Sequence, residues 1–523
     1  MTRTLIALLG AACGLYAAAP APVSDAAQSG DIALVRSLIA KHSDVNAAQG
    51  DGMTALHWAA SHDDVAMAKL LLASGAKPQT STRLRSMTPL FFAAQAGSGT
   101  VIDALAAAGA DVIAANETGL TPLMMAAAAG SVDALNALLR HGADVNAKES
   151  AREQTALMFA AAKNRGPAIR LLLAKGADAN TATKVTPVER VRFEPDPGAP
   201  PPEPPPADGT TTPMPPRREF GANLSGGMTA LLYAARDGAM DAVRALVESG
   251  ADVNRFSGSE KISPMVMAIS NGHFDIAKFL LDHDADPNLA TVQGLAPLYA
   301  TIDVQWSPHA WYPEPVVEQE QIGYLDLMSA LLARGANVNG RLDRKPWFRT
   351  TSHDATWIDT GGATAFWRAA QATDVTAMKL LVAAGANPKV ASSEGVTPLM
   401  VAAGLGWGWN FSTGAPEAWL GATRYCLELG LDVNAADSKG QTALHGAAYV
   451  ADNTLVQLLV DHGANIKAVA KDGNTVADMA NGPTRFGIPH PETLALLLKL
   501  GSANSRNCRS DTCLVAPTQE KKR

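Results

Sequence analysis

Apolar and polar positions recur along this chain with a period of 33 or 34 residues. Each copy begins with a small residue, usually Thr, followed by Pro or Ala, an apolar pair and further small residues, as in TALHWAA from Thr54. A second apolar stretch that ends in Leu-Leu follows, and a phrase such as GADVN, at residues 142–146, closes the copy. The copies begin at Thr54, Thr88, Thr121, Thr155, Thr229, Ser263, Ala296, Thr364, Thr397, Thr442 and Thr475. This period predicts a solenoid of stacked helix pairs.

The residue types within each copy explain why helices are expected there. Thr or Ser at the start caps free backbone N–H groups, and Pro is tolerated in the first turn, where its missing donor is not needed. The paired alanines let two helices approach closely, while the Leu-Leu pair supplies the apolar stripe of the second helix. Gly142 and its counterparts suit a helix end that turns through a left-handed conformation. Because one copy cannot bury its own apolar face, the copies are expected to stack.

These phrases resemble the ankyrin repeat family, and the resemblance covers residues 23–505 apart from the insertions. It implies an all-α ankyrin-repeat solenoid of about twelve helix-turn-helix repeats, counting a first repeat that begins near Ser24, with short β-turn fingers between them. It also implies a non-enzymatic scaffold that binds a partner protein through the fingers and the concave face of the first helices. The resemblance gives the mode of contact and leaves the partner unidentified.

The first residues differ from the repeats. They contain one early charge, Arg3, then an apolar stretch, small residues and prolines, which is the layout of a cleaved secretory signal peptide. We therefore expect an exported protein of the cell envelope, periplasmic or extracellular; acylation of Cys13, as in a lipoprotein, is the alternative. In order, the chain is expected to contain a signal peptide at 1–21, repeats at 22–183, a Pro-rich linker at 184–222, repeats at 223–505 and a tail with a cysteine pair at 506–523.

Three aromatic insertions interrupt the second block of repeats, near residues 304–320, 341–360 and 405–420. They contain seven of the nine tryptophans, so they either fold back over the solenoid as a cap or form a binding surface. The two alternatives are compatible. His309 and His353 in these insertions lack a helix-borne spacing such as HExxH, so no metal site is predicted.

Partner-binding candidates are taken from the fingers and from the insertions. We place the main surface around the insertions, because interface energy concentrates in a few aromatic and Arg side chains. The finger candidates are Arg83, Arg85, Glu117, Arg152, Arg255 and Phe256, and the insertion candidates are Trp311, Trp347, Phe348 and Trp409.

Composition and missing motifs exclude several functions. A net charge of -7 without a long Lys/Arg run argues against nucleic acid as a partner. No transmembrane segment follows the first twenty residues, and no GxSxG motif, phosphate loop or metal signature is found, so neither catalysis nor a cofactor is predicted. The competing hypotheses are a small-molecule or glycan pocket formed by the Trp-rich insertions, with or without hydrolytic chemistry, and a mechanical spacer. A monomer is expected.

His57 and His445 stand at one position of the repeat, three residues after the opening Thr. Most copies have Phe, Met, Leu or Val there, so we expect buried rings bonded to the backbone of a neighbouring turn rather than catalytic bases. The next position, which we call the file, is expected to pack between repeats rather than to form an exposed groove. Its apolar members are Trp58, Phe92, Met125, Phe159, Tyr233 and Met267.

The remaining cysteines are interpreted from the expected export. Cys426 falls inside a second helix, where a buried free thiol is expected. Cys508 and Cys513 form a short NCRSDTC loop, which in an oxidising compartment predicts a disulfide that pins the tail. A metal site would need more ligands nearby.

Overall fold

The computed structural model describes residues 20–187, 224–258, 260–307, 315–346, 358–408, 412–415, 418–482, 487–505 and 508. These residues form twelve helix pairs and one small two-stranded sheet. The predicted all-helical solenoid is therefore confirmed. The chain divides into two compact units: unit 1 is Met1–Lys184 with Met228–Asp252, and unit 2 is Val185–Gly227 with Val253–Arg523.

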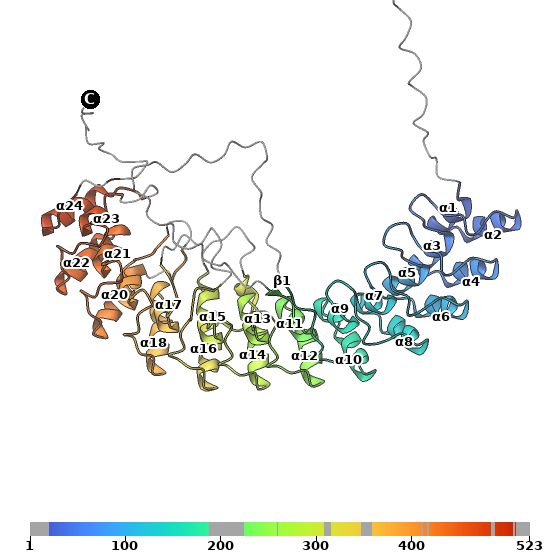
Figure 1. The fold of residues 1–523 in the computed structure, drawn as a ribbon, viewed down its shortest axis with the longest axis horizontal. Coiled ribbons are helices and arrows are strands. Elements are labelled where there is room, and N and C mark those ends of the chain that lie inside the picture. Colours follow the sequence, from blue (N-terminus) through green and yellow to red (C-terminus); the bar gives the residue numbers. More distant parts are fainter. Residues whose placement is uncertain are drawn as a thin grey trace, which may run out of the picture. The chain divides into compact units, whose positions relative to one another are not determined.

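Unit 1 contains six of these pairs, each made of a first and a second helix. The helices are α1 (Pro22–Gln28), α2 (Ile32–Ala40), α3 (Ala55–Ser61), α4 (Val65–Ala73), α5 (Pro89–Ala96), α6 (Gly99–Ala107), α7 (Pro122–Ala129), α8 (Val132–Arg140), α9 (Ala156–Ala162), α10 (Gly166–Ala174), α11 (Ala230–Arg236) and α12 (Met240–Glu248). Figure 1 shows the first helices α3, α5, α7 and α9 in one row, with α4, α6, α8 and α10 in a second.

Unit 2 contains the other six pairs and a short 3-10 turn, η1. Its helices are α13 (Pro264–Ser270), α14 (Phe274–Asp282), α15 (Pro297–Gln305), η1 (Val317–Gln319), α16 (Tyr324–Ala333), α17 (Ala365–Gln371), α18 (Val375–Ala383), α19 (Pro398–Ala402), α20 (Ala418–Glu428), α21 (Ala443–Tyr449), α22 (Asn453–Asp461), α23 (Val476–Met479) and α24 (Pro491–Leu500). The strands are β1 (Thr186–Pro187) and β2 (Leu224–Ser225), which pair antiparallel.

The grouping of helices differs from a division at the Pro-rich segment. Helices α11 and α12, which follow that segment in sequence, pack against α9 and α10 and belong to unit 1. Strands β1 and β2 join the two ends of the segment, because Thr186 pairs with Ser225. The repeats before and after this segment therefore stack directly on each other, and the two ends of the segment lie side by side.

Capping side chains fix the start of both helices in a pair. Thr229 accepts a hydrogen bond from the backbone N–H of Leu232 at the start of α11, and Ser263 does the same for Val266 in α13. Second helices more often begin with Asp or Ser; Asp64, for example, accepts from Met67 N at 2.8 Å. Each cap satisfies a donor that the helix leaves free, which is typically worth about 1 kcal/mol.

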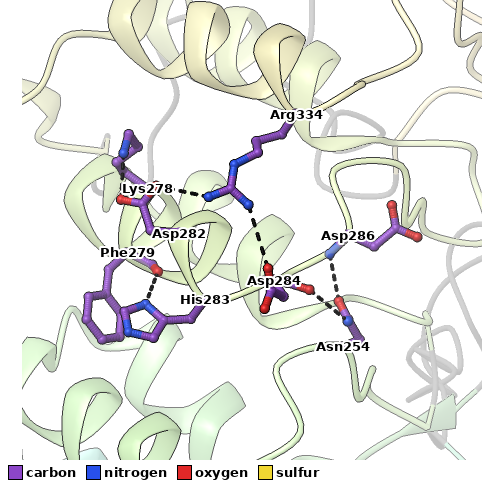
Figure 2. Close-up of polar contacts among 8 residues, drawn as sticks. All are labelled: Asn254, Lys278, Phe279, Asp282, His283, Asp284, Asp286 and Arg334. Atoms are coloured by element: carbon purple, nitrogen blue, oxygen red, sulfur yellow. Dashed lines mark hydrogen bonds and ion pairs between the residues drawn. The ribbon is translucent and has the colours of Figure 1, made fainter.

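Where the closing phrase ends in Asn, that Asn links its repeat to the next. Figure 2 shows that the Asn254 amide donates to the carbonyl of Asp284 (3.2 Å) and accepts from the N–H of Asp286 (2.8 Å). The same paired contact joins Asn146 to residues 176 and 178 in unit 1. It also crosses the first aromatic insertion, since Asn288 binds Gly335 O and Asn337 N. The bridge therefore depends on stacking and not on the number of residues between repeats.

Charged side chains surround this bridge in unit 2. Arg334, which follows α16, approaches Asp282 and Asp284 at 3.9 and 3.7 Å, and Lys278 pairs with Asp282 within α14 (Figure 2). His283 stacks on Phe279, with 4.0 Å between ring centroids. Because these ion pairs are exposed, each contributes little to stability.

Candidate interaction surfaces

The fingers of unit 1 are tied to one another through their backbones. Arg83 N donates to Asp51 O at 2.9 Å, and Ser150 N and Lys184 N make the same contact with the preceding finger. Arg83, Arg85 and Arg152 all lie exposed on these loops. Leu84, between two of the arginines, is 77% exposed. The backbone contacts therefore present cationic and apolar side chains on fixed loops.

The other finger candidates, Glu117, Arg255 and Phe256, have surroundings that differ from those of the three arginines. Glu117 is exposed, and its carboxylate accepts a hydrogen bond from Ser86 at 2.6 Å, which links two fingers of unit 1. Phe256, in a finger of unit 2, is 45% exposed beside the exposed Arg255. The Lys261 ammonium lies 5.8 Å from the Phe256 ring centroid. This fingertip combines one aromatic ring with two cations.

The file in unit 1 is partly exposed. Trp58, Phe92, Met125 and Phe159 are half-buried, whereas the alanines and leucines beside them in the same helices are buried. Trp58 Nε1 donates to the finger residue Gln49 at 2.9 Å. The expectation that the file packs between repeats is therefore met only in part.

The last file residue of unit 1, Tyr233, shows how closely the file and the fingers lie. Gln154 of a finger donates to its hydroxyl at 3.0 Å. Burial raises the pKa of Tyr233, and the nearby Arg236 and Arg152 oppose that shift. Tyr233 itself is only 6% exposed, so at this end of unit 1 a finger contacts a buried member of the file.

The file positions of unit 2 are buried. Met267, Ala300, Arg368, Val401 and Met479 occupy the position four residues after the opening residue, and all lie below 9% exposure. Gly446 is at the same position, and a Cβ atom added to it would lie 2.5 Å from the backbone nitrogen of Leu405. Chain from the third insertion thus runs directly over a first helix.

Arg368 on α17 is the charged member of this buried file. Its Nε donates to Asp303 of α15 at 2.8 Å, with the two side chains only 5% and 7% exposed. Its Nη2 donates to the carbonyl of Trp306, the first insertion residue after α15. Burial of an ion pair is tolerated when further hydrogen bonds satisfy it, which the Trp306 carbonyl helps to do.

Asp374 forms a second polar contact with the first insertion. One carboxylate oxygen caps α18 by accepting from Ala377 N, and the other accepts from Trp306 Nε1 at 2.9 Å and Tyr324 Oη at 2.7 Å. Burial, reinforced by the bond to Asp374, raises the pKa of Tyr324. The insertion between α15 and α16 is thus fastened at both ends to the start of α18.

The insertions meet one another in unit 2. Thr413 donates to the carbonyl of Ser307 at 2.6 Å, which joins the third insertion to the first. Ile358, at the end of the second insertion, faces Gly406 so closely that a Cβ there would overlap its side chain. We call this assembly the insertion cluster. It borders a shallow pocket lined by Trp306, Arg368, Gln371, Val401, Leu405, Gly406, Trp407, Ser412 and Thr413.

None of the four insertion candidates falls within the described residues. Trp311, Trp347, Phe348 and Trp409 lie outside the described residues, as do His309, His353 and Cys513. Of the described insertion residues, Trp306 lies 6.1 Å from Tyr324 and Trp407 lies 5.3 Å from Trp419, centroid to centroid and edge-on. Cys426 is a buried free cysteine, while the pairing of Cys508 with Cys513 stays a prediction.

His57 has the surroundings of a structural residue. Thr54 N–H donates to Nδ1 at 3.1 Å, so Nε2 carries the proton and donates to Met87 O of the next repeat at 3.1 Å. Burial lowers the pKa of His57 to about 4, and likewise that of His445 to about 4, so both rings are neutral at pH 7. Trp367 makes the equivalent bond from Nε1 to Val396 O.

The sequence interpretation missed Arg368, Asp303 and Asp374. A signal for Arg368 was present, because TAFWRAA places a charge where the other copies have an apolar or small residue. Asp303 and Asp374 had no comparable signal: one lies in a first helix and the other resembles an ordinary cap. Their roles arise only when the first insertion brings Trp306 to α17 and α18.

The described residues contain neither a metal-binding cluster nor a helix suited to span a membrane. Among them, no group of three or more His, Cys, Asp or Glu side chains is arranged to bind a metal ion. None of the helices they form is long and apolar enough to cross a membrane.

Comparison with known proteins agrees with this architecture. Models described as ankyrin repeats match residues 23–116, 108–183, 216–291 and 427–480, together more than half of the chain. The BTB/POZ domain and ankyrin repeat-containing protein NBCL of Lotus japonicus is 44% identical over 70 residues, which are 13% of this chain and 14% of that protein. The ankyrin repeat and LEM domain-containing protein 1 homolog of Caenorhabditis elegans is 49% identical over 49 residues, 9% and 7% of the two chains. The ankyrin repeat and SOCS box protein 6 of Pongo abelii is 46% identical over 56 residues, 10% and 13%. The matched part is thus at most about one seventh of each relative.

Proposed function

Because the chain belongs to the ankyrin repeat family, we propose that it is a non-enzymatic scaffold that binds a partner protein through its fingers and the faces of its first helices. The observation that carries this function is the set of exposed fingertips. Leu84 and Phe256 are solvent-exposed apolar side chains next to arginines, on loops whose backbones are bonded to their neighbours. Arg and aromatic residues are the types that dominate the energy of protein interfaces, and fixed loops lose little entropy on binding.

The relatives support this class of function and no particular partner. Their names place BTB/POZ, LEM or SOCS box domains beside ankyrin repeats. The similarity to this chain covers a short stretch of each, so their partners are not transferred to it.

We further propose that the scaffold is exported, acts in the cell envelope and is monomeric. The leader-like residues 1–21 and the Cys508 and Cys513 pair support export. Thiol labelling of denatured protein, taken from the cells that make it, should leave both cysteines unlabelled until reductant is added. Free labelling of both would contradict the disulfide, and light scattering would test the monomer.

The binding function is tested by isolating the full chain from its native extract. We expect one stoichiometric protein to copurify, and a variant combining Arg83→Glu, Arg85→Glu and Phe256→Ala to lose it. Lys69→Glu, on the exposed side of α4, is the matched charge control and should retain the partner. A preparation without any copurifying protein, or loss of the partner with Lys69→Glu alone, would contradict the proposal.

The pocket beside the insertion cluster favours a second function, binding of a small molecule or glycan. Trp306 and Trp407 line it, and Arg368 contributes a guanidinium whose Nη1 makes no hydrogen bond to any described residue. Native mass spectrometry of the protein as isolated tests this alternative. A ligand present once per chain would support it, and a mass equal to that of the protein would oppose it.

A further inference from the structure

The surroundings of the file can be compared between unit 1 and unit 2. In unit 1, four of its side chains, Trp58, Phe92, Met125 and Phe159, are apolar and partly exposed. In unit 2 the chain itself covers the same position: Leu405 lies over Gly446, and Arg368 and Val401 line the pocket beneath Trp306 and Trp407. The molecule therefore shows what covers this face of a repeat, namely non-helical chain with aromatic side chains. In unit 1 no described residue does so.

Exposed cations also lie at the edge of the open face. Arg83, Arg85 and Arg152 are exposed on the fingers of unit 1, and none of them makes an ion pair with a described residue. Glu117 accepts from Ser86 and Glu149 accepts from the backbone of its own finger, so neither carboxylate forms an ion pair with these arginines. Gln154, two residues after Arg152 in the same finger, donates to the Tyr233 hydroxyl at 3.0 Å, so this finger reaches the file.

We propose that the open face of unit 1 binds an extended, acidic segment of a partner protein that inserts aromatic side chains against the file. The inference rests on the proposed protein-binding function and specifies its surface and the chemistry of its partner. Aromatic side chains of the partner pack against Phe92, Met125 and Phe159, as Trp306 and Trp407 pack in unit 2. Acidic side chains of the partner pair with Arg83, Arg85 and Arg152. In unit 2 the file position is covered by the chain's own residues, so this particular site belongs to unit 1.

The test uses the full chain and two synthetic peptides. The first has the sequence of residues 404–421, GLGWGWNFSTGAPEAWLG, which includes Leu405 over Gly446 and the pocket-lining Trp407. The second carries Asn410→Asp and Thr413→Asp to raise its negative charge. Each is labelled with a fluorophore and titrated with the protein by anisotropy. We expect both to bind, the acidic peptide at least tenfold more tightly at low salt.

Protein variants locate the binding. Phe92→Ser combined with Met125→Ser should weaken both peptides at least tenfold, while Leu34→Ser, an exposed leucine of α2, should change binding less than twofold. Arg152→Glu should abolish the preference for the acidic peptide, whereas Lys69→Glu should preserve it. Circular dichroism and thermal melting confirm that each variant is folded. No binding, or binding unchanged by Phe92→Ser with Met125→Ser, would overturn the inference.

This outcome is separable from failure of the proposed function. If a native partner copurifies and depends on Phe256 but not on Phe92 and Met125, the scaffold function stands and the open-face inference is wrong. If no protein copurifies at all, the function itself fails.

Discussion

Unit 1 and unit 2 are built from the same repeat and use one position of it differently. At the file, unit 1 has Phe92 and Met125 partly exposed, whereas unit 2 has Ala300 and Arg368 buried, the latter in contact with the inserted residue Trp306. The alanine and leucine positions that stack the helices are buried alike in both units. The difference teaches that stacking of the helices does not require the file, so that inserted chain covers it in unit 2 while the described residues of unit 1 leave most of it partly exposed.

The largest effect is expected from Arg368→Ala. This change removes the guanidinium from a buried carboxylate and from the Trp306 carbonyl, which should destabilise unit 2 by about 3–5 kcal/mol. Hydrogen exchange followed by mass spectrometry should show faster exchange in α15 to α19 and unchanged exchange in unit 1.

The control for this variant is Arg140→Ala, because Arg140 pairs with Asp103 at an exposed site of unit 1, with side chains 65% and 43% exposed. Its cost should be about 1 kcal/mol or less. Arg368→Met with Asp303→Leu should recover most of the lost stability, since apolar residues can replace a buried pair. Equal costs for Arg368→Ala and Arg140→Ala would show that the insertions are not held by this contact.

The pH dependence should be shared by the two units, since unit 1 contains His57 and unit 2 contains His445, both buried and neutral. Each ring has its pKa lowered from 6.5 to about 4, so below pH 6.5 the unfolded chain binds a proton that the folded chain does not. Stability should therefore fall as the pH decreases from about 6.5 to about 4 and then level off, by about 3 kcal/mol for each histidine.

His57→Met and His445→Met test this assignment. Met124, Met158 and Met400 occupy the same position in other repeats, so both variants should fold. His57→Met should flatten the pH dependence of exchange in unit 1 alone, and His445→Met in unit 2 alone. A slope that persists unchanged in both variants would assign it to other groups.

The smallest effect is expected from the asparagine bridges. Asn146→Ala in unit 1 and Asn254→Ala in unit 2 each remove a paired amide contact between exposed loops, at a cost of about 1 kcal/mol. The two values should be equal within error in urea unfolding followed by local exchange. A much larger cost for Asn254→Ala would indicate that the charges in Figure 2 act together with the bridge.

The sequence was sufficient for the parts that recur. Thr229 and Ser263 start helices because a hydroxyl caps a free N–H wherever it occurs, and His57 could be interpreted because other repeats replace it with Met or Phe. Repetition supplies its own comparison, and the fold followed from it.

The insertion cluster occurs once, so no repeat predicts it. Thr413 and Ser307 meet because α15, α17 and α19 stack, which brings together insertions separated by many residues. Sequence spacing does not reveal that Asp374 caps a helix and also binds Trp306. The sequence likewise does not reveal that the file is half-buried in unit 1 and buried in unit 2, because that difference depends on which chain covers each repeat.

The contact between Thr413 and Ser307 also affects the order in which parts of the chain fold. It joins residues 106 positions apart, whereas the bridge from Asn146 to Gly176 spans 30. Closing a longer loop costs more entropy before any contact rewards it, and contacts of high sequence separation slow folding. During synthesis, unit 1 acquires most of its contacts repeat by repeat, while the insertion cluster has to wait until residue 415 has emerged. Until then the aromatic side chains of the insertion cluster remain exposed to solvent and to chaperones. Formation of this cluster is therefore the folding step at which newly made protein is most prone to aggregate.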